Sequence, residues 1–248
     1  MVRGFILVVL VVLAGAVLVG CGGSSGLHLE EGKFAEDGGA EVVELQNAVR
    51  QMQPGDSWEY EVTGSVSDGK ATSEVTGAYT VTVSADTVAA PLGDVTRVVL
   101  ESATLSYNGG IHPLPNKSYI TQDENGTVWT YGGERNSSVY WVDVPSEGRY
   151  MSVASPLTQE TNWTKYVRLT DGSTFNLAYA AAGVVTITVP AGNLETRKLA
   201  GNGTFAGMPS VVQEWWAPQI GAPVQRTVVF THQGLTFALT AKLTARSR

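Results

Sequence analysis

The chain has 248 residues, a formal net charge of −7 at pH 7 and 43% hydrophobic residues. An acidic surface disfavours densely negative partners, so the composition argues against nucleic acid and against flat binding to anionic headgroups. The single cysteine excludes a disulfide within the chain, and stability must therefore come from a packed core.

The N-terminal residues have the composition of a secretory leader. Arg3 supplies a short positive region, and residues 5–19 form an unbroken run of apolar or small side chains. This run is short for a comfortable membrane span. An uncleaved signal anchor is the alternative. Both interpretations place residues 22–248 outside the cytoplasm.

Cys21 follows the apolar run in the tetrapeptide Leu18-Val19-Gly20-Cys21. Small Gly20 suits a peptidase that cuts directly before the cysteine. The tetrapeptide resembles the bacterial lipobox, which implies a diacylglycerol anchor with palmitate on Cys21 and a signal peptide over residues 1–20. Two or more acyl chains anchor a protein stably, so we predict an extracytoplasmic, membrane-anchored lipoprotein. Gly22, where a retention signal would place Asp, favours the outer membrane if the host has two membranes.

Residues 21–54 connect this anchor to the domain. Residues 22–39 are rich in Gly, Ser, Glu and Asp, which predicts a flexible tether. A short amphipathic helix over 41–53, lying against the sheet, is predicted by apolar residues at spacings of three, four and three, namely Val42, Leu45, Val49 and Met52. Pro54-Gly55 would end it. A helix lying on the membrane is the alternative, but its polar face carries more acid than base.

From Trp58 onward, apolar residues recur at every second position. Residues 58–63, 75–84 and 235–244 all alternate in this way. Such alternation predicts antiparallel strands with one face on a core and one toward water. Hairpin turns are predicted at Asp68-Gly69, Asn108-Gly109, Asn125-Gly126, Asp171-Gly172 and Gln233-Gly234. We therefore predict a mainly β domain over 55–248, built as a curved antiparallel sheet, either a half-barrel or two packed β repeats, with one short N-terminal helix.

Short sequence echoes suggest an internal duplication. The second half repeats features of the first at offsets of 100 to 106 residues: Trp58 and Trp163, Asp68-Gly69 and Asp171-Gly172, residues 80–85 and 186–191, and Thr96-Arg97 and Thr196-Arg197. Each half alone would expose a sheet face that pairing would bury. The echoes predict two repeats over 55–155 and 156–248. Chance matches in a Thr- and Val-rich chain are the alternative explanation.

Three segments carry a resemblance to a known family. They are Gly55-Asp56-Ser57-Trp58-x-Tyr60, Val189-Pro190-Ala191-Gly192 and Trp216-Ala217-Pro218-Gln219-Ile220-Gly221. Together they resemble a group of uncharacterised bacterial lipoproteins with a VPAG…W-x-P-x-x-G signature, whose sheet is similar in style to the Lol-type lipoprotein carriers. The resemblance implies an anchor and a sheet curved around an apolar cavity. It implies no established activity.

Groups for catalysis or metal binding are scarce. The histidines are His28 in the tether, His112 in a Pro-rich loop and His232 in a hairpin turn. No pair of them has ligand spacing and no second cysteine is present, so we expect no metal and no cofactor. A triad would need one of these histidines beside a serine, which leaves a hydrolase as an alternative. We predict a protein that is not an enzyme.

Aromatic side chains are the candidate contact residues. Neighbouring residues on a strand face opposite ways, so Tyr140-Trp141 and Trp215-Trp216 each place one ring away from the core. Trp129 lies in the same aromatic-rich stretch as Tyr140. An exposed tryptophan can stack on a sugar or anchor a protein partner, whereas a ring that covers a sheet edge has only a structural role. The candidate ligand or partner contacts are Trp129, Tyr140, Trp141, Trp215 and Trp216.

Taken together, the sequence predicts a lipid-anchored cell-envelope lipoprotein whose curved sheet binds an apolar ligand or an envelope protein. Its partners are the membrane, through the lipid on Cys21, and this ligand or protein, with no nucleic acid. The alternative is a surface glycan-binding module that uses the exposed aromatics.

Overall fold

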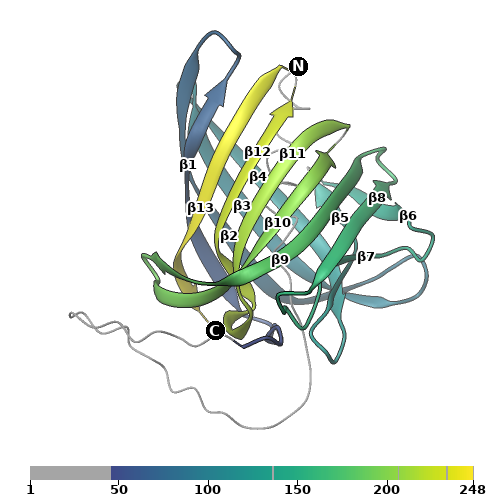
Figure 1. The fold of residues 1–248 in the computed structure, drawn as a ribbon. Helices are drawn as coiled ribbons and strands as arrows, with labels where there is room; N and C mark the ends of the chain where they lie inside the picture. The colour runs from purple at the N-terminus through teal and green to yellow at the C-terminus, as the bar shows by residue number, and fades with distance from the viewer. Residues whose placement is uncertain (1–45, 136, 206, 233, 248) are drawn as a thin grey trace.

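The computed structural model describes residues 46–247, apart from 136, 206 and 233, and these residues form one antiparallel sheet (Figure 1). The strands are β1 (Ser57–Ser67), β2 (Thr72–Ala89), β3 (Val95–Tyr107), β4 (Gly110–Gln122), β5 (Val128–Arg135), β6 (Ser138–Val144), β7 (Tyr150–Val153), β8 (Asn162–Leu169), β9 (Thr174–Val189), β10 (Gly192–Phe205), β11 (Met208–Ala217), β12 (Ala222–His232) and β13 (Leu235–Ser247).

The sheet closes on itself into a barrel of twelve strands. Its order is β4-β3-β2-β1-β13-β12-β11-β10-β9-β8-β6-β5, and β5 pairs with β4 to complete the ring. That last seam runs from Asn116 opposite Arg135 to Gln122 opposite Val128. The prediction of a curved sheet, built as a half-barrel or as two packed β repeats, is therefore wrong. Closure gives each of the twelve strands a hydrogen-bonded neighbour on both sides, which is the physical advantage of a barrel over an open sheet.

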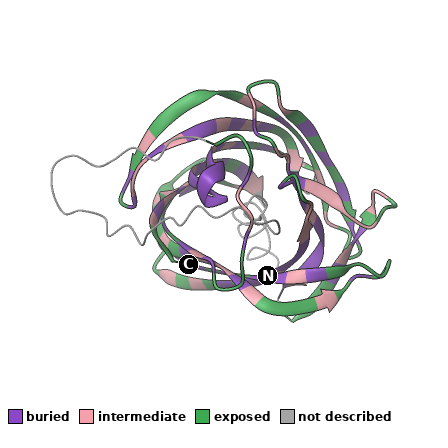
Figure 2. Cartoon of the chain, turned by 90° about the horizontal axis from the view of Figure 1, so that it is seen from below, coloured by how far each residue is buried: buried purple, intermediate pink, exposed green. Residues whose placement is uncertain are grey.

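The predicted alternation sets the two faces of the barrel wall. In β1, Trp58, Tyr60 and Val62 are buried while Glu59 and Glu61 are exposed. The other long strands follow the same period of two, because successive side chains on a strand point to opposite faces. Buried residues consequently recur along every part of the wall (Figure 2). The interior holds the core, and the outer face is rich in threonine and charged residues.

The predicted turns lie between neighbouring strands. Asp68-Gly69 joins β1 to β2, and Asp171-Gly172 joins β8 to β9. Asn108 and Gly109 join β3 to β4 with φ values of 50° and 71°. A tight type I′ hairpin turn needs positive φ at both of its central residues, and Asn-Gly meets that need at little steric cost.

The helix predicted over 41–53 is wrong within its described part. Residues 46–53 are irregular, and residues 41–45 lie outside the described residues. Residues 46–56, here called the strap, bond to the barrel instead of forming a helix. Arg50 N donates to Pro218 O at 2.7 Å, and Leu157 N donates to Asn47 O at 2.7 Å, while Asp56 N donates to Gln53 O at 3.0 Å in a turn at the end of the strap. Val49 and Met52 are buried as expected, but from an extended strap. The following proline also disfavours helical geometry at Gln53.

A single turn of 3₁₀ helix, η2 (Pro218–Ile220), lies at the same end of the barrel as the strap (Figure 1). Within the part of the chain that the structure describes, no helix has the length and apolar character needed to cross a membrane.

Two sets of contacts correspond between the halves of the chain. Thr96 Oγ1 donates to Val88 O at 2.8 Å, and Thr196 Oγ1 donates to Val185 O at 2.7 Å. The adjoining arginines, Arg97 and Arg197, donate to Met52 O and Leu157 O, which both belong to fully buried residues five positions before β1 and β8. The contacts correspond in kind, and the sequence repeats over 55–155 and 156–248 stay a hypothesis.

Candidate binding site in the barrel interior

Four buried charged residues face the barrel interior from strands whose neighbouring inward residues are apolar. They are Glu101 in β3, Lys165 in β8, Glu214 in β11 and Arg226 in β12. Inward positions recur every second residue, and in each case the inward neighbours on both sides along the strand are buried and apolar. The four rows are Val99-Glu101-Ala103, Trp163-Lys165-Val167, Val212-Glu214-Trp216 and Val224-Arg226-Val228. The charges therefore form a level between two apolar layers.

We call this level the polar belt. Its members are buried and are linked by strand register, hydrogen bonds or mutual electrostatic influence, and they are Tyr60, Tyr79, Glu101, Asn116, Ser118, Arg135, Lys165, Tyr179, Glu214 and Arg226. Strand pairing places Tyr60 opposite Tyr79, and Glu214 opposite Arg226. The belt thus draws its members from most of the circumference of the barrel.

An ion pair between Arg226 and Glu214 is the strongest interaction in the belt. Arg226 Nε and Nη2 donate to Glu214 Oε1 at 2.9 and 2.5 Å. The other carboxylate oxygen, Oε2, accepts from Trp216 Nε1 at 2.7 Å. Arg226 and Glu214 are only 3% and 1% exposed. Burying two charges costs free energy unless good geometry and further hydrogen bonds compensate. A buried ion pair is therefore weak evidence that these residues serve only to stabilise the fold.

Glu101 has two hydrogen-bond donors. Ser118 Oγ donates to Oε1 at 2.7 Å, and Asn116 Nδ2 donates to Oε2 at 3.1 Å. Burial raises the pKa of Glu101 to about 7, although these donors and the charge of Arg226 act in the opposite direction. The carboxyl group therefore changes its charge near neutral pH.

Lys165 is the second belt residue whose charge changes near neutrality. Burial lowers its pKa to about 7, and nearby Glu214 opposes that shift. Its Nζ lies 4.5 Å from the ring centroid of Tyr179, a cation–π arrangement, and that ring stacks on Trp163 with centroids 5.0 Å apart. Perturbed titrating groups that gather in one place are a mark of functional sites.

Several buried polar atoms of the belt have no partner. Tyr60 Oη, Asn116 Oδ1 and Arg226 Nη1 accept or donate no hydrogen bond among the described residues. Tyr60 is 3% exposed and Asn116 is 5% exposed. Nearly all buried polar groups in proteins find a partner, because leaving one unsatisfied costs free energy. These three atoms therefore lack the hydrogen bonds that buried polar groups usually make.

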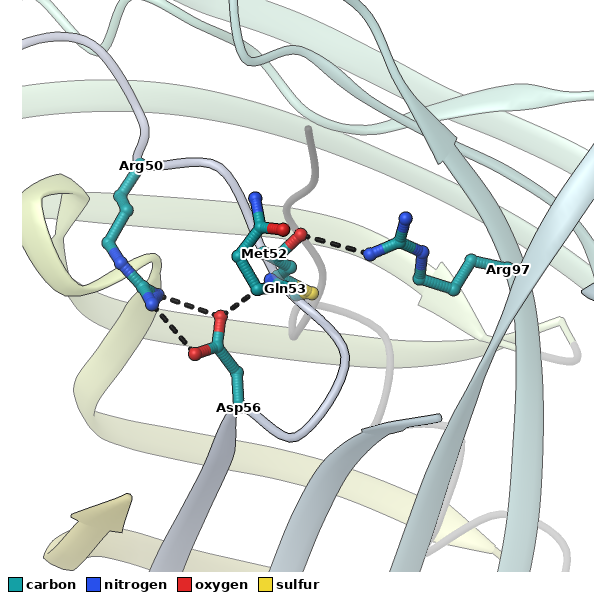
Figure 3. Close-up of polar contacts among 5 residues, drawn as sticks. All are labelled: Arg50, Met52, Gln53, Asp56 and Arg97. Atoms are coloured by element: carbon teal, nitrogen blue, oxygen red, sulfur yellow. Dashed lines mark hydrogen bonds and ion pairs between the residues drawn. The ribbon is translucent and has the colours of Figure 1, made fainter. Parts of the chain in front are cut away.

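The strap is held across one end of the barrel by buried polar contacts (Figure 3). Arg50 Nη1 and Nη2 donate to the two carboxylate oxygens of Asp56 at 2.9 and 2.7 Å, and Gln53 N donates to the same carboxylate at 2.7 Å. Arg97 Nη1 reaches from β3 to Met52 O at 3.1 Å. These contacts fix the strap to this end of the barrel.

The candidate aromatic contacts do not form one surface. Tyr140 and Trp216 are buried, whereas Trp129, Trp141 and Trp215 are partly exposed. The exposed rings come from β5, β6 and β11, and β11 is four places further round the ring than β6.

Each of these partly exposed rings already contacts a neighbour. The guanidinium of Arg149 lies 4.7 Å from the ring centroid of Trp129, and Lys198 Nζ lies 5.4 Å from the ring centroid of Trp215. The ring centroids of Tyr119 and Trp141 are 5.2 Å apart. Among the buried rings, Tyr140 lies under the guanidinium of Arg135 at 4.0 Å.

The remaining sequence candidates contribute little to a site. His112 stacks on Tyr107 with centroids 4.1 Å apart, and Cys21 and His28 lie outside the described residues. In the described part of the chain, no group of three or more His, Cys, Asp or Glu side chains is placed to hold a metal ion.

The polar belt was missed by the sequence analysis. A usable signal was present, because Lys165 and Arg226 stand in the apolar phase of alternating strands, as in Val224-Gln225-Arg226-Thr227-Val228. Residues two apart on a strand share a face, so a charged residue between two inward-facing apolar residues must also face the interior. Which of these buried residues meet one another depends on the ring order of the strands.

Comparisons with known proteins add three solved structures. No protein-family profile and no curated protein matches the chain. A Bacteroides fragilis protein, described as exported and YmcC-like in fold, is 10% identical with a TM-score of 0.36 and covers 79% of this chain and 97% of its own. A Parabacteroides distasonis protein described as a lipoprotein is 12% identical with a TM-score of 0.37 and covers 82% and 99%.

The third structure is a porin-like protein from Bacteroides uniformis. It is 12% identical with a TM-score of 0.22, and the match covers 75% of this chain and 95% of that one. At these identities and TM-scores, the three similarities assign no ligand, partner or reaction to this chain.

Proposed function

We propose that the protein is a lipid-anchored lipoprotein of the cell envelope and is not an enzyme. The leader over residues 1–20 and the lipobox-like Leu18-Val19-Gly20-Cys21 support the anchor and the extracytoplasmic location. In a host with two membranes, Gly22 favours the outer one. The resemblance to bacterial lipoproteins stated above agrees with this assignment.

We propose further that the barrel holds an apolar ligand in its interior. The observation that carries this proposal is the set of buried, unpartnered polar atoms in the belt, flanked on both sides by apolar layers. Ligand sites in proteins are mostly apolar with a few placed polar groups. Barrel diameter grows with strand number, and side chains just fill a barrel of about eight strands, so twelve strands enclose more space.

The anchor is tested by labelling the full chain with an alkyne analogue of palmitate in a bacterial host. The wild type is expected to carry the label and to sediment with membranes. Cys21→Ser is expected to lose the label, whereas Ser24→Ala, a neighbouring change, keeps it. Label on the Cys21→Ser chain contradicts the anchor.

The ligand is tested by native mass spectrometry of the lipidated full chain in amphipol. The wild type is expected to carry a bound apolar molecule. Ala241→Leu enlarges an inward side chain beside Arg226 and is expected to reduce occupancy, whereas Thr240→Leu, which faces outward, leaves it unchanged. Equal occupancy in these two variants contradicts a site inside the barrel.

A further inference from the structure

Arg226 interacts electrostatically with most of the titratable residues of the polar belt. Its charge affects the pKa values of five other belt residues, which are Tyr60, Tyr79, Glu101, Lys165 and Tyr179. Glu214 engages only two of its three guanidinium nitrogens. The third, Nη1, is buried and has no partner among the described residues. A guanidinium is always charged and offers donors in a fixed planar arrangement, so this nitrogen presents unused donors to the interior.

Tyr60, on the other side of β13 from Arg226, supplies a second unused group. Its Oη is buried without a hydrogen-bond partner among the described residues, and its ring lies 5.6 Å from that of Tyr79. Tyr60 pairs with Leu243 in β13, and Arg226 pairs with Ala241, the preceding inward residue of that strand. The two side chains are therefore separated along β13 by one inward step, and Ala241 is the smallest side chain of that inward row.

The charges of the belt also favour an additional anion. Arg226 and Lys165 can carry positive charge, and Glu214 balances one of them. Glu101 is largely neutral below about pH 7, because burial raises the pKa of its carboxyl group to that value. Arg135 is a further buried cation, opposite the belt residue Asn116, and it pairs with Asp171 at 3.1 Å. An incoming anionic group would stabilise the charged form of Lys165 and would be attracted by the positive charge of Arg226.

We propose that the interior ligand is amphipathic and carries an anionic oxygen group, a carboxylate or a phosphate, that accepts hydrogen bonds from Arg226 Nη1 and Tyr60 Oη. Its apolar part packs against the layers on either side of the belt, such as the inward residues Val228 and Leu239. This inference rests on the proposed function, because it defines the chemical class of the ligand held in the same interior.

The test compares three probes of equal chain length on the lipidated full chain in amphipol: octanoate, octyl phosphate and 1-octanol. Isothermal titration at pH 7 is expected to show an anionic probe binding at least about tenfold more tightly than octanol, the effect of one to two hydrogen bonds to a charged group. Preference for octanoate identifies a carboxylate ligand, and preference for octyl phosphate identifies a phosphate ligand.

Tyr60→Phe is the informative variant. It removes an oxygen that has no partner among the described residues, so the fold is expected to keep its stability. We expect the anionic probe to bind about tenfold more weakly and octanol to bind unchanged. Tyr131→Phe is the matched control, because Tyr131 is also buried but its Oη accepts from Arg149 Nη1, outside the belt.

A second variant, Arg226→Met with Glu214→Gln, removes both charges of the buried pair and keeps an acceptor for Trp216 Nε1. It is expected to abolish the preference for anionic probes. Suppose that octanol binds as tightly as both anionic probes and that Tyr60→Phe changes the affinity of none of the three. The anionic class is then overturned while the interior site stands. If none of the three probes binds saturably, the interior site itself is overturned.

Discussion

At the scale of single residues, the barrel has two titrating groups where most barrels carry apolar side chains. Lys165 is 4% exposed, and its pKa is lowered to about 7 chiefly by burial. Glu101 is 2% exposed, and its pKa is raised to about 7 for the same reason. Burial disfavours the charged form of each side chain in the folded state. Both residues therefore lower the free energy of unfolding near neutral pH.

Replacing Lys165 by Met is expected to stabilise the protein by roughly 2–4 kcal/mol at pH 7, because the variant no longer buries an ammonium group. In the wild type, the unfolded chain binds the lysine proton between pH 7 and 10 while the folded chain has lost it. Wild-type stability therefore rises with pH in that range, and the advantage of the variant shrinks. Urea unfolding at pH 7 and pH 9 measures both effects, and a pH-independent difference would contradict the assignment.

For Glu101→Gln, the stability advantage of the variant over the wild type is expected to grow with pH, whereas that of Lys165→Met shrinks. Below about pH 4.5 the carboxyl is protonated in both states, and between pH 4.5 and 7 only the unfolded chain ionises. Wild-type stability is lost over that interval, whereas the variant keeps it. We expect nearly equal stabilities at pH 4.5 and a variant more stable by about 1–3 kcal/mol at pH 8. The unpartnered Oδ1 of Asn116 can accept from the new amide after a side-chain flip. Equal stabilities at pH 8 would refute this reasoning.

At the scale of elements, the strap shows how tertiary contacts override helical spacing. Val49 and Met52 stand three residues apart and are both buried, which fits the predicted helix. Arg50 N, which lies between them, nevertheless donates to Pro218 O in η2, and Arg97 donates to Met52 O. An isolated helix of about twelve residues is marginal in water, so these contacts suffice to displace it.

Asp56→Asn is expected to loosen the strap, since it weakens a buried carboxylate that accepts from both Arg50 and Gln53 N. Trypsin cleavage after Arg50 in the full chain should then be several-fold faster, as local opening becomes easier by about 1–2 kcal/mol. Asp143→Asn is the matched control, because its ion pair with Arg168 is exposed and contributes little. Equal cleavage rates in the two variants would mean that Asp56 does not hold the strap.

At the scale of the whole molecule, the strands of the closed barrel differ in how extensively they are paired with their neighbours. The seam between β6 and β8 has only two paired positions, and β7 pairs with β5 alone over three positions. Hydrogen exchange followed by mass spectrometry is therefore expected to be faster in β6 and β7 than in β1, β2, β12 and β13. Exchange that is equally slow in all of these strands would contradict this order of local stability.

The sequence by itself determined the local structure of this protein. Alternation of apolar and polar residues fixed the strands, because a half-buried strand has a period of two, and Asn-Gly and Asp-Gly fixed several hairpin turns. Only the tertiary structure decided that β4 pairs with β5, that residues 46–53 form no helix, and that Glu101, Lys165, Glu214 and Arg226 share one belt. Those features depend on contacts between residues far apart in the chain, and the spacing of neighbouring residues carries no information about which distant partners they meet.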